Sequence, residues 1–435
     1  MQTFTPARSS SMHLDVIVVL ALRNLRRQLR RTVLTASAMI VGGWLLIFSF
    51  SIGDGTHENW IDAGVRTGTG HVTVERPEFQ LSKKIEDRLP AHVRSEVEQA
   101  LASPEIASEV IAVSARLTIN GLASSPAGAR PAQIMAVNPA DEARFSSFDD
   151  QLVEGRYLGP DDRLGAYVGL GLVESLDLRL GSRFVVQAQD AEQEIAGQLL
   201  RVVGIFRSGV PEVDQRVIHI LLQTGGDWLG SGRDVTNVGV VVNESTAVEG
   251  VAAHLARVLV EPVSRGDARV MDWRESTPAL ASAIAIDNFG NYLIYTILFT
   301  IIGFGIVNTI LMSVLHRHRE FGVLQALGLT PSQTGAIVLV EGLTLTAVSG
   351  LVGVGLGVFT TWYFFGAEGL DLSALIGEEM TFSGVVIDPV IFPLFRLTRL
   401  VQVLVFILFI GAVASVYPAF RAARIDTAES MKFER

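Results

Sequence analysis

Three side chains of the metal-binding type lie in one short polar stretch: His316, His318 and Glu320. On a helix, residues two positions apart project from different faces, so these three side chains do not converge on one ion. The zinc-binding pattern H-E-x-x-H, which places two histidines four residues apart, does not occur in the chain. The spacing therefore predicts a solvated charged flank, and we expect no metal site.

Motifs for nucleotides and for nucleophiles are also missing from the sequence. Gly169 and Gly171 resemble the start of a phosphate-binding loop, but the dinucleotide pattern requires a third glycine at the position of Glu174. The P-loop motif requires Gly followed by Lys, and the chain has no such pair. There is no nucleophile elbow, and no cysteine for thiol chemistry or disulfides. We therefore predict that the chain is not an enzyme and has no catalytic residue and no cofactor of its own.

Four apolar segments must position the polar stretch. A helix of on the order of 20 apolar residues crosses the hydrocarbon core of a bilayer, which is about 30 Å thick. The predicted spans are 32–52, 286–315, 334–362 and 400–417. The polar stretch, 316–333, connects the second span to the third. The second span is longer than a bilayer requires, so we expect its outer turns to project as a stalk.

The long segment between the first two spans, 53–285, mixes two kinds of pattern. Helical periodicity fits 85–102, 168–178 and 246–258. Runs typical of strands occur at 71–75, 110–119, 133–137, 183–188, 199–206, 216–222 and 237–243. This order predicts an α+β domain of two lobes. The expected fold class is a membrane protein with four transmembrane helices and a large α+β extracytoplasmic domain.

The distribution of charge predicts which side each segment faces. Segments 1–31, 316–332 and 421–435 carry twelve basic and five acidic residues, although the whole chain has a net charge of −10. Positive charge is retained on the cytoplasmic side of membrane proteins, so both termini and the polar stretch are expected there. The loop 363–399 and segment 53–285 would then lie outside. No extended basic surface is present elsewhere, which disfavours nucleic acid as a partner.

The N-terminal segment, 1–31, is amphipathic from Met12 onward, with leucines on one side and arginines on the other. One interpretation is an interfacial helix that lies on the inner leaflet of the membrane. The alternative is a simple charged flank of the first span, which gives the same topology. At the other end of the chain, residues 418–435 are predicted to form a cytoplasmic tail.

Four residues inside the predicted spans attract attention. Gly353 and Gly357 form a GxxxG pair that indicates close helix packing, within the subunit or across a dimer. Glu341 is an acid in the first turns of the third span, where we favour a structural hydrogen bond over a proton relay. Asn308, in the second span, is typical of a contact between helices rather than of a substrate ligand. We keep both as candidates for an intramembrane polar site.

The polar stretch becomes amphipathic after its charged start. Phe321, Leu324, Leu327 and Leu329 recur at near-helical spacing, and Gly328 followed by Pro331 is a signal for the end of a helix. The sequence predicts a short amphipathic helix held between two spanning helices. Such a helix is suited to pushing against a soluble partner.

The segment EFGVLQALGLT, Glu320 to Thr330, resembles the loop of FtsX-like ABC permeases between their second and third spans. Segments 133–186 and 202–223 are similar to the periplasmic domain of that superfamily, and the C-terminal tail resembles its ending. The resemblance implies that the loop forms a coupling helix seated in a cleft of a separate ATPase, which would hold ATP and Mg²⁺. The residues it assigns to this contact are Glu320, Phe321, Gly322, Leu324, Leu327 and Gly328.

The resemblance also implies a cellular role and a set of partners. The segment GTGHVTVERPEF, which follows the first span, resembles most the corresponding segment of the lipoprotein-releasing (LolC/LolE-type) permeases. We therefore expect a permease of the bacterial inner membrane that works with an ATPase dimer and with a second permease copy or paralogue. Membrane lipid and a lipoprotein cargo would be its other partners. ATP hydrolysis in the ATPase would be transmitted mechanically through the spans to the outer domain.

Two alternatives and one departure from the family pattern accompany this expectation. Permeases that recruit a periplasmic chaperone carry a proline-bearing hook, but the corresponding segment, 188–198, has no proline. The chain could instead be a mechanotransmitting exporter that works with an outer-membrane duct. It could also be a non-transporting regulator of a cell-wall hydrolase, although an outer domain of roughly 230 residues is large for that class.

Overall fold

The computed structural model describes residues 29–376, 380–382, 385–387 and 389–425. The chain divides into two compact units, which we describe separately. The helical unit comprises Met1–Thr56, Asp287–Leu370 and Ile391–Arg435, and the sheet unit comprises His57–Ile286 and Asp371–Val390. The predicted N-terminal helix and most of the predicted tail fall at 1–28 and 426–435, outside the described residues.

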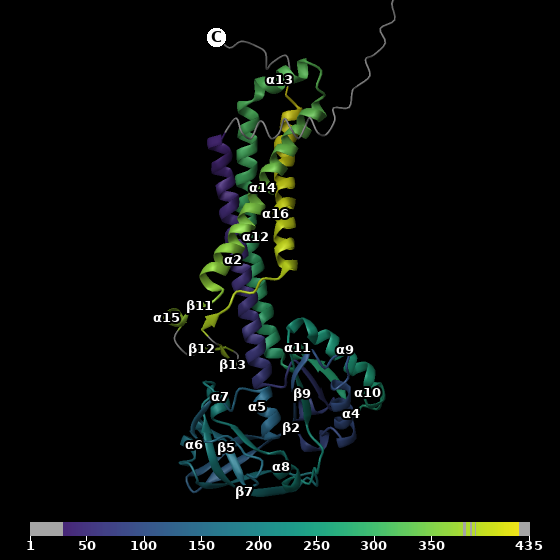
Figure 1. The fold of residues 1–435 in the computed structure, drawn as a ribbon, viewed down its shortest axis with the longest axis vertical. Helices are drawn as coiled ribbons and strands as arrows, with labels where there is room; N and C mark the ends of the chain where they lie inside the picture. Colours follow the sequence, from purple (N-terminus) through teal and green to yellow (C-terminus); the bar gives the residue numbers. More distant parts are fainter. Residues whose placement is uncertain (1–28, 377–379, 383–384, 388, 426–435) are drawn as a thin grey trace, which may run out of the picture. The chain divides into compact units, whose positions relative to one another are not determined.

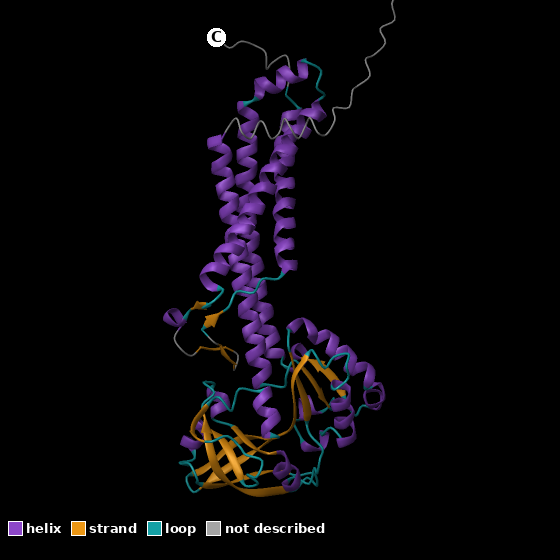
Figure 2. Cartoon of the chain, in the orientation of Figure 1, coloured by secondary structure: helices purple, strands orange, loops and turns teal. Residues whose placement is uncertain are grey.

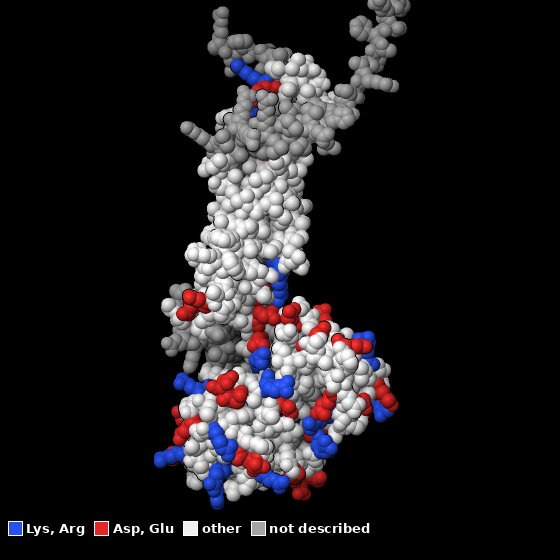
Figure 3. All heavy atoms as spheres, viewed as in Figure 1, with Lys and Arg blue, Asp and Glu red and all other residues white. Residues whose placement is uncertain are grey.

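Four long helices are long and apolar enough to cross a membrane (Figures 1 and 2). They are α2 (Leu29–Thr67), α12 (Pro278–His316), α14 (Pro331–Phe365) and α16 (Leu397–Ala423). Figure 3 shows that their visible surface carries a long band without charged residues. At 1.5 Å per residue, the 39 residues of α2 and of α12 extend about 58 Å, well beyond a hydrocarbon core of about 30 Å. The four predicted apolar helices are confirmed, and all four are longer than the predicted spans.

The end of α16 differs from the expected end of the fourth span. We predicted that the tail would begin at Pro418, but the helix continues through this proline to Ala423. Proline costs the helix one hydrogen bond because it has no backbone N–H. Packing offsets this loss: Ala419 and Ala422 are buried, and a Cβ on Gly335 of α14 would lie 3.1 Å from the Ala419 carbonyl oxygen.

The sheet unit contains one ten-stranded sheet with the order β10-β1-β9-β2-β3-β8-β5-β7-β4, and β6 pairs with β2 and β7. Strand β2 (Val110–Ser125) is 16 residues long and pairs with β9 in its first half and with β3 in its second. The other strands are β1 (Val72–Glu75), β3 (Gly128–Val137), β4 (Leu152–Gly155), β5 (Gly165–Gly169), β6 (Arg183–Gln189), β7 (Ile195–Phe206), β8 (Val217–Leu221), β9 (Asn237–Val242) and β10 (Arg269–Asp272).

Two hydrophobic cores form along this sheet, as expected of two lobes. One core packs β1, β9 and β10 beneath α4 (Ala91–Leu101) and α9 (Val248–Val258). The other core packs β3, β5 to β8 and the second half of β2 beneath α6 (Leu170–Ser175). The remaining helices of this unit are α3 (Phe79–Ser82), α5 (Pro139–Phe145), α7 (Pro211–Asp214), α8 (Leu222–Trp228), α10 (Val260–Arg265) and α11 (Trp273–Ser276), with 3-10 turns at Ile85–Asp87 and Ser245–Ala247.

Two predicted helices are shorter than their patterns indicated. The α-helical part of 85–102 begins only after Pro90, because proline fixes the backbone that starts a helix. The predicted helix 168–178 divides into the end of β5 and the short α6. A Cβ on Gly169 would lie 2.3 Å from the Asp214 carbonyl oxygen, so this glycine permits a close approach of two backbones. The glycine pair at 169 and 171 therefore has a packing role here.

A buried ion pair connects α5 to β2. Arg116 forms hydrogen bonds to both carboxylate oxygens of Glu142, at 2.5 and 2.9 Å, and Ser114 donates a third at 2.7 Å. Burial is the largest single influence on the pKa of Glu142 and raises it, but the charge and hydrogen bonds of Arg116, together with the hydrogen bond from Ser114, lower this pKa below its usual value. The Arg116 guanidinium also lies 4.2 Å from the centre of the Phe145 ring. Glu142 therefore stays ionised in the core and fixes α5 on the sheet.

The predicted outer loop, 363–399, starts and ends within helices, because α14 continues to Phe365 and α16 begins at Leu397. It also contains short regular elements that we did not predict. These are β11 (Leu370–Asp371), α15 (Ser373–Ile376), β12 (Met380–Phe382), β13 (Val385–Ile387) and β14 (Val390–Ile391). Strands β12 and β13 pair with each other in antiparallel register.

Candidate coupling site

The polar stretch folds into a short helix, α13 (His318–Ala326), between α12 and α14. The chain turns sharply on both sides of it. Gly328 has φ +105°, which a glycine adopts without the steric strain that other residues incur. The Leu329 N–H then donates to the Leu324 carbonyl at 3.1 Å and ends the helix. A capping box between Thr330 and Gln333 starts α14 directly afterwards.

Arg317, at the junction of α12 and α13, holds this helix in place. It is only 8% exposed, and its Nη1 donates to Oε2 of Glu341 on α14 at 3.0 Å. Its Nε donates to Oε2 of Glu320 on α13, also at 3.0 Å. The guanidinium lies 4.8 Å from the centre of the Phe321 ring. One side chain therefore connects three helices with two charged hydrogen bonds and a cation–π contact.

Phe321 anchors the inner face of α13. We expected this residue to fill a cleft in a partner, but its side chain is fully buried. It packs with apolar residues of α12, α14 and α16, including Ile310, Val338 and Ala422. Gly322 is also buried, and Leu324 is half-buried against the same cluster. These three residues hold α13 against the helical unit, and the buried Phe321 and Gly322 offer little surface to a partner in this structure, whereas the half-buried Leu324 stays a predicted contact residue.

The outer face of α13 carries two exposed apolar residues one helical turn apart. Leu327 is 77% exposed and Val323 is 48% exposed. Gly328 is exposed beside them, and the Glu320 carboxylate is partly exposed. Of the residues that the sequence assigned to a partner contact, Leu327 and Gly328 are exposed and Glu320 is partly exposed, and Val323, which the sequence did not assign to it, is exposed as well. A second apolar stripe, four residues apart and opposite Phe321, was the signal that could have identified it.

Glu341 and Asn308 differ in their surroundings. Glu341 is 14% exposed at its side chain and pairs with Arg317, which agrees with the structural role we favoured. Asn308 is exposed on the surface of α12 and is far from this ion pair along the helix. The structure therefore does not bring these two residues together in one polar site. The sequence predicted a solvated charged flank at His316, His318 and Glu320, but Arg317, which lies between them, is buried because the acid in α14 provides it with a partner.

Comparison with known proteins places these features in a family. The model for the MacB-like periplasmic core domain matches residues 32–258, and the model for the FtsX-like permease C-terminal domain matches residues 292–427. Together they cover both units of the chain. The chain belongs to the FtsX-like ABC transporter permeases.

Individual relatives are distant. The LolC transmembrane protein of the lipoprotein-releasing system of Neisseria meningitidis is 22% identical over 332 residues, which are 75% of this permease and 79% of that protein. The permease YknZ of Bacillus subtilis is 25% identical over 55% of this permease and 56% of YknZ. The macrolide export protein MacB of Brucella melitensis is 25% identical over 78% of this permease, which spans about half, 52%, of MacB.

Solved structures of outer domains also align with the permease. The periplasmic region of MacB from Actinobacillus actinomycetemcomitans aligns with a TM-score of 0.34 and 13% identity, covering 48% of this permease and 92% of that region. The extracellular domain of YknZ aligns with a TM-score of 0.33 and 14% identity, covering 46% of this permease and 99% of that domain.

The GxxxG pair of the permease packs within the subunit. A Cβ on Gly353 would lie 2.8 Å from the Ile40 carbonyl oxygen of α2, and one on Gly357 would lie 2.8 Å from the Ile47 Cβ. Close to them, Trp44 Nε1 donates to Thr360 Oγ1 at 2.7 Å. These contacts hold α2 directly against α14. Of the two interpretations left open by the sequence, the structure shows packing inside one chain.

An ion pair connects α2 to α16. Arg399 donates to both carboxylate oxygens of Asp54, at 2.9 and 3.2 Å, and lies 5.0 Å from the centre of the Phe50 ring. In the predicted topology this end of the fourth helix faces outside, where positive charge runs against the positive-inside pattern. Because the Asp54 carboxylate pairs with it, the Arg399 charge is compensated within the helical unit.

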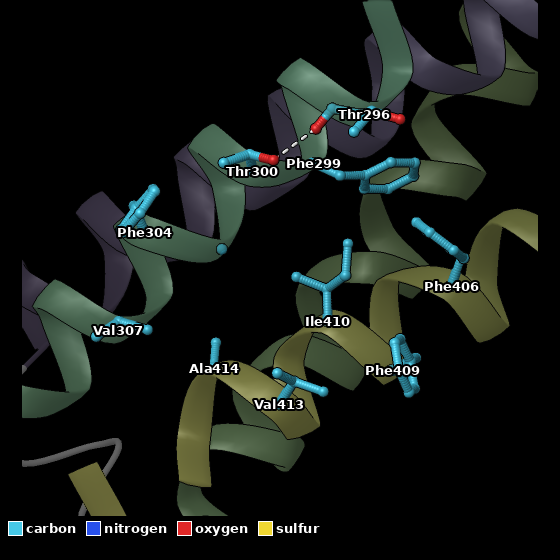
Figure 4. A pocket seen from close by; sticks show the side chains of 11 residues that line it. Thr296, Phe299, Thr300, Phe304, Val307, Phe406, Phe409, Ile410, Val413 and Ala414 are labelled. Carbon is cyan, nitrogen blue, oxygen red and sulfur yellow. Dashed lines mark hydrogen bonds between the residues drawn. The ribbon is translucent and has the colours of Figure 1, made fainter. Parts of the chain in front are cut away.

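A cavity of about 400 Å³ lies between α12 and α16 (Figure 4). Phe299 and Phe406 are part of its lining and pack against each other with ring centres 4.5 Å apart. Two threonines in its wall, Thr296 and Thr300, donate their hydroxyl hydrogens to backbone carbonyls one turn earlier. The eleven residues that line the cavity include no charged side chain. Its environment is therefore suited to hydrocarbon and unsuited to a charged group.

Proposed function

We propose that this permease couples ATP hydrolysis by a separate ATPase dimer to a conformational change outside the inner membrane. A second permease copy or paralogue would complete the assembly, with both termini in the cytoplasm. The supporting observation is that Arg317 and Phe321 fix the inner face of α13 to the other helices, whereas the outer face exposes two apolar side chains, Val323 and Leu327. A rigidly held helix with an apolar face can transmit displacement to the helices on either side of it.

The direction of transmission follows from the contacts of α13. Arg317 connects it to the end of α12 and to Glu341 on α14, and Phe321 packs in the core that α12, α14 and α16 share. A push on Val323 and Leu327 would therefore displace the helix ends together rather than bend α13 alone. In this proposal ATP and Mg²⁺ are bound by the partner ATPase, and the permease transmits the motion through α13 to its long helices.

We propose that the cargo is a lipoprotein or another lipid-anchored molecule that is released from the inner membrane. Support comes from the alignment with LolC, which covers three quarters of this permease and 79% of LolC. Segment 188–198, which corresponds to the chaperone hook, contains the end of β6, a turn and the start of β7, and it has no proline, so we do not assign it a chaperone contact. ATP-dependent release of a lipid-anchored protein from reconstituted vesicles would test this part.

A second candidate is a mechanotransmitting exporter that works with an outer-membrane duct. The match of residues 32–258 to a MacB-like periplasmic core favours it, and MacB is named as a macrolide export protein. Co-purification of a duct protein, together with no release of lipid-anchored cargo, would favour the exporter over lipoprotein release.

The coupling proposal is tested by charging the exposed face of α13. Val323→Asp and Leu327→Asp should lower association with the ATPase at least tenfold and abolish the ATP hydrolysis that the permease stimulates. Leu81→Asp is the matched control, because Leu81 is an exposed leucine (93%) of the sheet unit. If both variants bind and stimulate the ATPase as the wild type does, α13 is not the contact.

A further inference from the structure

A cleft of about 550 Å³ lies in the sheet unit, apart from the features that the coupling proposal uses. One wall is α4, which contributes Arg94 and Glu98, and the other is α5, which contributes Asp141 and Arg144. The first half of β2 runs between these walls, with Ile111 and Val113 in the lining. The two helices cover opposite faces of the sheet, because α4 packs with α9 on the core of one face whereas Phe145 of α5 packs on Ala112 and Val241.

One edge of β2 has no strand partner in this cleft. Residues 110–116 pair with β9 on one side, whereas β3 and β6 pair only with residues 117–125. Among the described strands, none continues the sheet beyond the first half of β2. Alternate residues of a strand direct their N–H and C=O groups to opposite sides, so part of this backbone points away from β9. An unpaired strand edge is a template for another extended chain.

A side chain already occupies part of this edge. Arg144 Nη2 donates to the Ile111 carbonyl oxygen at 3.2 Å, where the N–H of an added strand would donate. Ile111 is 39% exposed, so the position is open to solvent. The guanidinium satisfies this acceptor without closing the cleft, and it can be displaced by a backbone donor.

The charge of the walls selects among ligand classes. Each wall carries one cation and one carboxylate, and Arg94 Nε lies 2.8 Å from Glu98 Oε1 on α4. The two carboxylates would repel a polyanion, and the four charged groups would disfavour a hydrocarbon chain. A polypeptide backbone, neutral overall with alternating donors and acceptors, matches both the edge and the balanced charge.

We propose that the first half of β2 binds an extended segment of a separate polypeptide, which adds a strand to the sheet between α4 and α5. Residues 111–115 span about 16 Å of edge, which is five residues at roughly 3.3 Å each; Ile111 is exposed and Val113 is half-buried, whereas Ala112, Ser114 and Ala115 are buried between the two faces of the sheet. Side chains of both signs on the incoming segment would meet the four charged residues of the walls. This inference does not rest on the coupling function, since it concerns only the sheet unit.

The test uses full-length permease in detergent micelles and a random library of seven-residue peptides selected against it. Hydrogen exchange then locates the bound peptides. A selected peptide should slow exchange of the amides of 111–115 at least tenfold, and the same peptide with alternate backbone nitrogens methylated should not. N-methylation removes the donors that a paired strand requires and preserves every side chain.

Two variants identify the cleft. Ala107 is exposed and lines the cleft, so Ala107→Trp should fill it and weaken peptide binding at least tenfold. Ala127, exposed in the turn between β2 and β3, provides the control Ala127→Trp, which should bind within twofold of the wild type. The proposal is overturned if no selected peptide protects 111–115, if Ala107→Trp binds normally, or if the methylated peptide binds equally well. Protection of these amides in the free protein that rises with protein concentration would also overturn it, because a second copy would then occupy the edge.

Discussion

Removal of Arg317 should loosen α13. Its side chain is 9% exposed and pairs with Glu341, whose side chain is 14% exposed. Removing one partner of a buried ion pair costs about 3–5 kcal/mol, because the other charge is left buried and unpaired. The lost contact with the Phe321 ring adds on the order of 1 kcal/mol. Partial access of solvent to Glu320 reduces the total, so we expect Arg317→Ala to lower the free energy of unfolding by about 3 kcal/mol.

A double-mutant cycle with Glu341 separates the ion pair from other effects. The free energy of unfolding is measured in the same micelles for Arg317→Ala, Glu341→Ala and the double variant. We expect the double variant to be little less stable than Arg317→Ala alone, with an interaction energy of about 2 kcal/mol. Additive effects of the two changes would refute the clamp. Arg317→Lys should be intermediate, because an ammonium group lacks the fork that reaches two carboxylates at once.

Three further predictions follow from contacts described above. Gly353→Leu should destabilise the helical unit by several kcal/mol or prevent its folding, because a Cβ at position 353 would lie 2.8 Å from the Ile40 carbonyl oxygen. Gly355→Leu is the control and should fold normally, because a Cβ at position 355 would have no other atom within 4 Å. Thermal unfolding in micelles compares the two variants. Burial lowers the pKa of His219 to about 4 from its usual 6.5, so the unfolded state binds the extra proton and the free energy of unfolding should fall by up to about 3 kcal/mol between pH 6.5 and pH 4. His219→Phe should flatten that part of the denaturation–pH profile, and an unchanged slope would count against this role for His219. Glu142→Ala should cost about 3–5 kcal/mol in denaturant unfolding, because it leaves the charge of its arginine partner buried, and a loss below 1 kcal/mol would show that the pair contributes little.

The sequence predicts most of the helical unit because the rule behind it is simple. An apolar run long enough to cross a bilayer must be helical, so four such runs give four helices. The ends are less predictable because they depend on tertiary packing. Pro418 looks like a helix end in the sequence, yet α16 continues past it where Ala419 packs on α14.

In the coupling site, sequence periodicity predicts the helix but not which of its faces is buried. Periodicity identified an amphipathic helix at 316–333, but it did not show which apolar face is inward. Phe321 and Leu327 look equivalent in the sequence, although one is fully buried and the other is 77% exposed. The ion pair of Arg317 with Glu341 could not be predicted, because the two residues lie 24 positions apart and a contact over that separation depends on the fold.

The outer domain shows the same limit for strands. Runs of β-branched residues locate seven of its strands, because alternating side chains fit a half-buried sheet. They do not show which edge stays unpaired, and β2 changes partner halfway along its length. That change of partner creates the cleft between α4 and α5.

The central claim is that α13 receives motion from a partner in the cytoplasm, and the exposed Leu327 provides the most direct test. The chain has no cysteine, so Leu327→Cys introduces a single thiol. We predict that a membrane-impermeant thiol reagent labels it only from the cytoplasmic side, and that the ATPase slows labelling at least tenfold, with a rate that changes when ATP is added. Labelling from the outer side, or a rate that is the same with and without the ATPase, would contradict the account.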